Sequence, residues 1–112
     1  MHSEITYTLK AFITLLPTDK GGRKRPVATG YRPALMFITH RSYSCEIELL
    51  DKDELKPGDN AMVNIKLLPA KTIPKNIRIN DSFTLLEGNK AVGNGIILNE
   101  IIKKESVIED VI

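Results

Sequence analysis

The first part of the chain alternates apolar and polar residues with a period of two. From residue 5 to residue 15 the odd positions are all apolar, whereas most even positions are threonine or lysine. A helix would need apolar residues three and four apart, so this pattern predicts a long β-strand with one buried face. Phe12 and Leu16 interrupt the polarity of its other face. Pro17 ends the strand, because proline donates no hydrogen bond to a sheet.

Shorter strand-like runs follow, with turns between them. Residues 35–39 are almost wholly apolar and predict a strand that is buried on both sides. Residues 45–49 and 63–67 alternate, as half-buried strands do. Residues 56–59 read Lys-Pro-Gly-Asp, which places proline and then glycine at the central positions of a type II turn.

The last part of the chain predicts a hairpin. Residues 83–87 and 91–102 flank a Gly-Asn pair at 88–89, which is a hairpin signal. Gly93 and Gly95 lie inside the second arm and indicate a bulge or a sharp bend at a barrel corner.

The whole pattern predicts one all-β domain over residues 1–112. Residues 69–79 predict a loop with room for one short strand. About six strands in a chain of this length favour closure into a small β-barrel, which removes unpaired sheet edges. Residues 5–102 would form this six-stranded antiparallel-type barrel. Residues 103–112 would be a C-terminal extension, too short to make a useful helix.

Composition places the chain among ordinary water-soluble domains, with 42% hydrophobic and 27% charged residues. No apolar run approaches the roughly 20 residues that span a bilayer, so we expect no membrane partner. Cys45 is the only cysteine, which excludes an intrachain disulfide. A reducing, cytoplasmic location fits this composition best, and residues 1–4 lack the layout of a signal peptide.

Charge is distributed unevenly along the chain. Residues 1–45 carry seven basic and two acidic side chains, whereas residues 46–112 carry nine basic and twelve acidic ones. The first part could therefore present a basic face to a partner. A solvated surface without a partner explains the same pattern equally well.

Catalytic chemistry is not indicated. The chain has no Gly-x-x-x-x-Gly-Lys-Ser/Thr loop for a nucleotide phosphate. His40 is expected in a surface turn, and Cys45 falls on the inward side of its strand, as a small core residue would. The acidic residues at 51–59 do not have the spacing of a calcium loop. We therefore expect no enzyme, no catalytic residue, no metal and no cofactor.

Basic residues crowd the loop at 18–29, and Arg32 follows it closely. Arginines in such a loop can bind phosphates or carboxylates of a partner. Alternatively, Arg23 or Arg32 pairs with an acidic residue across the barrel while the lysines stay solvated. The sequence leaves both interpretations open.

The turns, taken in order, resemble those of the third (C-terminal) domain of elongation factor Tu. The resemblance rests on Gly-Gly-Arg at 21–23, Tyr-Arg-Pro at 31–33, Pro-Gly-Asp-Asn at 57–60 and Glu-Gly at 87–88 with the glycines that follow. It covers roughly residues 5–102 and implies the six-stranded barrel that alternation also predicts.

The resemblance also implies sites. In that family the barrel is not catalytic; it packs on a GTPase domain and contacts the T-arm of aminoacyl-tRNA and the exchange factor Ts. The positions that would contact a protein are Gly21, Gly22, Arg23, Tyr31 and Arg32. The positions that would contact RNA are Ser44, Glu87, Gly88 and Lys90.

Several RNA-facing positions depart from the family pattern. Ala34 replaces a glutamine, Pro69 replaces a cationic residue or a histidine, and residues 86–91 lack the family's arginines. We therefore predict a non-enzymatic module that binds a protein of the translation apparatus through residues 21–32. Weak binding of tRNA or structured RNA is the second hypothesis. An orphan or split-factor domain without independent activity is the third, and the oligomeric state is open.

Overall fold

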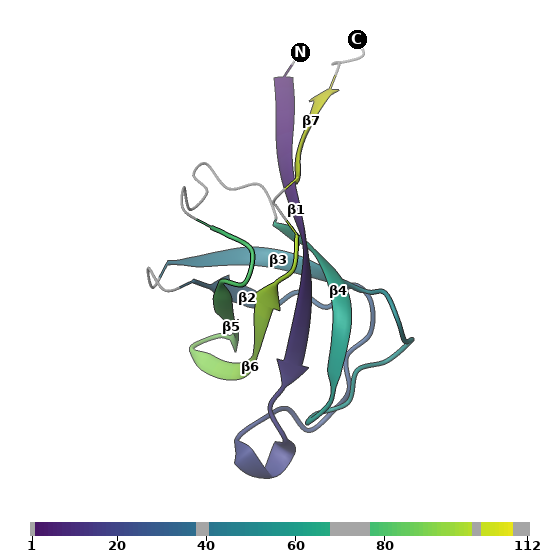
Figure 1. Cartoon of the computed structure of the whole chain (residues 1–112), viewed down its shortest axis with the longest axis vertical. Coiled ribbons are helices and arrows are strands. Elements are labelled where there is room, and N and C mark those ends of the chain that lie inside the picture. Colours follow the sequence, from purple (N-terminus) through teal and green to yellow (C-terminus); the bar gives the residue numbers. More distant parts are fainter. Residues whose placement is uncertain (1, 38–40, 68–76, 100–101, 109–112) are drawn as a thin grey trace.

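The computed structural model describes residues 2–37, 41–67, 77–99 and 102–108, and their regular secondary structure is almost entirely β (Figure 1). A single turn of 3-10 helix, η1, spans Thr18–Lys20. The strands are β1 (His2–Leu15), β2 (Ala34–Met36), β3 (Ser42–Leu49), β4 (Asn60–Leu67), β5 (Ser82–Glu87), β6 (Lys90–Ile97) and β7 (Ile102–Ile108).

Six of these strands close into a barrel. The long strand β1 pairs with β4 through residues 7–14 and with β6 through residues 11–15. The sheet order β4-β3-β2-β5-β6-β1, with the additional β4–β1 pairing, completes the ring. Every pairing in the ring is antiparallel. The predicted all-β, six-stranded closed barrel is confirmed.

The seventh strand was not predicted. β7 pairs with the first half of β1, from His2–Ile108 to Thr8–Ile102. The β6 pairing ends at Ala11–Ile97, so two extra residues are inserted before the β7 pairing begins. β7 thus continues the line of β6, and with the start of β1 it forms a ribbon that rises from the barrel (Figure 1). Part of the predicted C-terminal extension is therefore a strand.

The core follows the alternation that the sequence shows. Leu9, Ala11, Ile13 and Leu15 of β1 are 0–1% exposed, and Cys45 of β3 is also fully buried. Among the described residues, no polar or charged residue is buried. Because each strand turns one face inward, the barrel interior is filled by side chains from all six strands.

The glycine-bearing arm contains the irregularity that its sequence indicated. The β5–β6 register shifts between Leu85 and Leu86, and Val92 and Gly93 are consecutive buried residues there. A Cβ atom on Gly95 would lie 2.4 Å from Cζ of Phe83. Glycine is therefore needed because the Phe83 ring occupies the space above that strand.

The prediction that the strand at 35–39 is buried on both sides was wrong, whereas the turn predicted at 56–59 is present. β2 is not buried on both sides: Leu35 is buried, whereas Ala34 and Met36 are partly exposed, since a barrel wall has an outer face. The 56–59 turn has Gly58 at φ 86° and a 3.0 Å bond from Asp59 N to Lys56 O, as a type II turn requires. His40 and residues 69–76 of the predicted 69–79 loop lie outside the described residues.

Candidate binding groove

The Gly-Gly pair shapes the loop that follows β1. Gly21 ends η1 in the left-handed conformation, at φ 88°. Gly22 passes so close to the preceding backbone that a Cβ atom there would lie 2.0 Å from the carbonyl oxygen of Leu16. The Thr18 hydroxyl donates to the Arg23 carbonyl and holds the next turn of the loop. Both glycines thus have a structural reason to be present, and the loop delivers Arg23 to the barrel.

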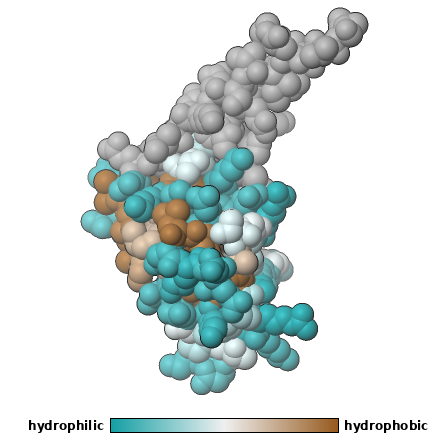
Figure 2. Space-filling model, turned by 90° about the vertical axis from the view of Figure 1, so that its right-hand side faces the viewer, coloured by the Kyte–Doolittle hydropathy of each residue, from teal (hydrophilic) through white to brown (hydrophobic). Residues whose placement is uncertain are grey.

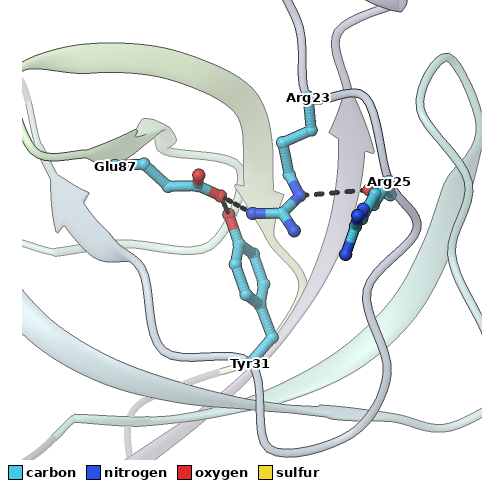
Figure 3. A network of polar contacts seen from close by, with 4 residues as sticks. All are labelled: Arg23, Arg25, Tyr31 and Glu87. Carbon is cyan, nitrogen blue, oxygen red and sulfur yellow. Dashed lines mark hydrogen bonds and ion pairs between the residues drawn. The ribbon is translucent and has the colours of Figure 1, made fainter.

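Arg23, Tyr31 and Glu87 form one polar network (Figure 3). Nη1 of Arg23 and the hydroxyl of Tyr31 both donate to Oε2 of Glu87, the last residue of β5. The Arg23 guanidinium carbon lies 5.1 Å from the centre of the Tyr31 ring, within range of a cation–π contact. Nε of Arg23 donates to the carbonyl of Arg25 at 3.2 Å. The network ties the 21–32 segment to the β5–β6 hairpin.

The network fixes the protonation state of its members. Partial burial acts to raise the pKa of Glu87, but the hydrogen bonds from Tyr31 and Arg23 outweigh it and hold this pKa below its ordinary value. Burial, together with the hydrogen bond to the Glu87 carboxylate, raises the pKa of the Tyr31 hydroxyl well above 10. At neutral pH the network therefore contains an ionised carboxylate and a neutral phenol.

Arg32 forms a second ion pair, with Glu46 of β3. Nε and Nη2 of Arg32 lie 3.2 and 2.9 Å from Oε2 of Glu46. The Arg32 side chain is 65% exposed, so this contact contributes little to stability. Both arginines thus pair with an acidic residue, as in the structural alternative that the sequence left open, although Glu46 lies on the strand bridged to the Arg32 segment and not across the barrel.

A shallow groove of about 560 Å³ lies between these two ion pairs. Its lining residues are Arg32, Pro33, Ala34, Ser44, Cys45, Leu86, Glu87 and Gly88. The structure therefore brings the candidate protein-contact residue Arg32 together with the candidate RNA-contact residues Ser44, Glu87 and Gly88.

The remaining candidates do not line the groove. Arg23 and Tyr31 hold Glu87 at its rim, and Lys90 pairs with Glu87 in the β5–β6 register. Gly21 and Gly22 shape the loop and do not line the groove. Sequence reasoning missed Pro33 and Leu86 as lining residues, although each adjoins a residue that it had singled out.

One comparison with known proteins decides the family. The family model described as "Elongation factor Tu C-terminal domain" matches residues 3–101. The chain belongs to this family. An elongation factor Tu C-terminal domain is a non-catalytic binding domain of translation factors.

Other chemical features of this elongation factor Tu-type barrel concern metal ligands, the cysteine and the membrane. Within the described ranges, no group of three or more histidine, cysteine, aspartate or glutamate residues could hold a metal ion. Burial raises the pKa of the Cys45 thiol to about 12, so this cysteine is a core residue and not a nucleophile. Among the described residues, no helix has the length and apolarity to cross a membrane.

Proposed function

We propose that this domain is a non-enzymatic module that binds a protein of the translation apparatus, of the GTPase-domain or exchange-factor kind, through the groove between Arg32 and Glu87. The observation that carries the proposal is the charge balance of the groove. Arg32 is paired with Glu46, and Glu87 is paired with Arg23. A groove whose charges are compensated has little attraction for a polyphosphate backbone.

The lining also favours a protein segment. Pro33, Ala34 and Leu86 supply apolar surface, and Arg32, Ser44 and Glu87 supply hydrogen-bonding groups. An apolar centre with a polar rim is the usual composition of a protein contact site. In this proposal Arg23 and Tyr31 position the Glu87 carboxylate at the rim and need not touch the partner themselves.

Site-specific crosslinking tests the proposal. Ser44→Cys places an exposed thiol in the groove, while the native Cys45 is buried and does not compete. A photo-crosslinker attached there is expected to capture a translation protein from lysate. Asp53→Cys, on the exposed segment that follows β3 and away from the groove, is the matched control and should not capture it.

Two results would decide against this function. If position 44 and position 53 captured the same proteins, the groove would not be the contact. If no translation protein were captured from position 44, and Arg32→Glu had no effect on any recovered complex, the chain would be an orphan or split-factor domain without independent binding.

Binding of tRNA or other structured RNA is the second candidate. It is favoured by one observation, the meeting of Ser44, Glu87 and Gly88 in one groove. Phosphate contacts release counterions, so RNA binding should weaken steeply as salt increases. A titration with unfractionated tRNA at low salt tests it, with Lys90→Ala expected to weaken binding. Absence of binding at low salt would eliminate this candidate.

A further inference from the structure

Four apolar side chains form a row across the outer face of the barrel. In the strand register, Phe12 of β1 pairs with Met62 of β4 on one side and with Ile96 of β6 on the other. Leu50 follows β3, and its N–H donates to the Met62 carbonyl at 3.0 Å. We call Leu50, Met62, Phe12 and Ile96 the apolar row.

The apolar row is accessible to solvent. Leu50 is 42% exposed and Ile96 is 43% exposed, while Phe12 and Met62 are partly exposed. Figure 2 shows apolar side chains gathered on the face that carries β4, with hydrophilic side chains around them. Phe12 is the residue that interrupts the polarity of the first strand, and the structure shows that its apolar neighbours come from other strands.

Polar residues border the row on both sides except beside Ile96, where the partly exposed Leu98 follows on the Lys10 side. Asn60, Thr14 and Asn94 lie one step along the strands in one direction, and Asn64 with Lys10 lies one step in the other. Glu48 pairs with Asn64 in the β3–β4 register and extends this second border. A narrow apolar stripe between two polar borders has the layout of a contact surface.

The row and the binding groove lie on opposite walls. In the ring of six strands, β1 is three strands away from β2 in either direction. The groove is built on β2, β3 and β5, whereas the row is centred on β1. The proposed function therefore does not account for the apolar row.

We propose that the apolar row is a self-association surface, and that its occupant is a second copy of this chain. Two-fold dimers are the commonest symmetric assemblies, and their contact surface must be complementary to itself. A two-fold axis along β4 places Met62 of one copy against Met62 of the other. The same axis places Leu50 of each copy against Phe12 of the other copy.

The charges along the second border favour a second copy of this chain as the occupant, because they complement themselves. The axis that aligns the row also places Glu48 of each copy against Lys10 of the other, so symmetry forms two ion pairs. The Lys10 side chain has no ion-pair or hydrogen-bond partner among the described residues, and the Glu48 carboxylate accepts only a 3.0 Å bond from the Asn64 amide there. A uniformly acidic partner would be attracted by Lys10 but repelled by Glu48, and a uniformly basic partner would meet the reverse.

Lys66 is the one like-charge contact that this axis creates. It is exposed and lies one step beyond Asn64 on β4, at the periphery of a contact between two convex walls. Lys66→Gln removes this repulsion and is expected to tighten the dimer.

Sedimentation equilibrium over a range of concentrations tests the proposal. The full chain is expected to form dimers, and K10E and E48K are each expected to raise the dimer dissociation constant about tenfold, because each creates two like-charge contacts. K24E makes the same charge change as K10E on an exposed loop and should leave the constant unchanged.

Mixing the two charge variants gives the decisive result. A heterodimer of one K10E chain and one E48K chain restores opposite charges at both contacts, so the mixture should dimerise as tightly as the unaltered chain. A merely structural role of either residue predicts no recovery on mixing. Circular dichroism melting of each variant shows whether the chain is folded.

Three outcomes would overturn the proposal. They are an unaltered chain that stays monomeric at every concentration, a mixture that recovers no dimer, and dimers that are unaffected by Met62→Asp in a folded chain. The chain could instead be monomeric and bind a translation protein without using the groove. If Ile96→Asp abolished that binding, the row would be the contact surface for that protein.

Discussion

A single carboxylate oxygen of Glu87 accepts hydrogen bonds from both Arg23 and Tyr31. The residues are 64 and 56 positions away from Glu87 in the chain. The loop after β1 and the β5–β6 hairpin are therefore joined at one atom beside the groove. Charge-assisted hydrogen bonds are stronger than neutral ones, so this contact contributes to both the fold and the shape of the groove.

Removing the Glu87 charge should make the free energy of unfolding less dependent on pH under acidic conditions. The pKa of Glu87 in the folded domain is below its ordinary value of 4.5. A carboxylate with a lowered pKa stabilises the folded state above the ordinary pKa, and this contribution disappears as pH falls from 4.5 through the folded pKa. Urea unfolding of Glu87→Gln should therefore show a smaller loss of stability over this range than the unaltered chain. Glu54→Gln is the control for removal of one negative charge.

Identical acid profiles for Glu87→Gln and the unaltered chain would contradict the network. That result would mean that Glu87 does not gain its hydrogen bonds to Arg23 and Tyr31 in solution.

Tyr31→Phe should remove the loss of stability that ionisation of this hydroxyl causes at alkaline pH. The pKa of Tyr31 in the folded domain is raised above its ordinary value of 10.0, so its hydroxyl stabilises the folded state fully below pH 10 and loses this effect as pH rises further. The variant should be less stable by about 1 kcal/mol at pH 7, the value for an ordinary hydrogen bond, because Glu87 is partly exposed.

Ultraviolet titration of phenolate absorbance checks this assignment. The chain has three tyrosines. Subtracting the Tyr31→Phe curve from that of the unaltered chain should isolate one tyrosine that ionises only at strongly alkaline pH. A difference curve centred near pH 10 would show that Tyr31 is not engaged by Glu87.

Local patterns predicted the barrel but not the groove. Alternation in residues 5–15 identified the strand and its inward side chains, because period two follows from strand geometry alone. The partner of Arg23 could not be predicted in the same way. The Arg23–Glu87 pair depends on the pairing of β6 with both β5 and β1, and sequence spacing carries no information about which loops such pairing brings together.

The apolar row, too, could be predicted only in the part that depends on a single strand. The sequence marked Phe12 as an interruption of polarity, since this needs only its own strand. Its neighbours Met62 and Ile96 come from strands whose register with β1 is set in the folded barrel. β7 was missed for a related reason: its pairing with the start of β1 follows two inserted residues that no periodic pattern reveals.

The two glycines of the Gly-Gly-Arg turn should differ in their response to substitution. Gly22→Ala places a methyl group 2.0 Å from the Leu16 carbonyl oxygen, so backbone must move. We expect a loss of about 3 kcal/mol, at the upper end for overpacking. Gly21 has open space around it and only its positive φ disfavours alanine, so Gly21→Ala should cost about 1 kcal/mol. Equal losses in urea unfolding would contradict the close approach at Gly22.

Cys45 should be almost unreactive in the folded domain. Its side chain is fully buried, its Sγ–H donates to the Pro33 carbonyl at 3.3 Å, and burial raises its thiol pKa to about 12. The thiolate is the reactive form, so alkylation at neutral pH should be slow in buffer and fast in denaturant. Ser44→Cys, one position earlier on the opposite face of β3, should react rapidly under the same conditions. Comparable rates for the two cysteines would show that the β3 wall beneath the groove is not packed as the structure describes.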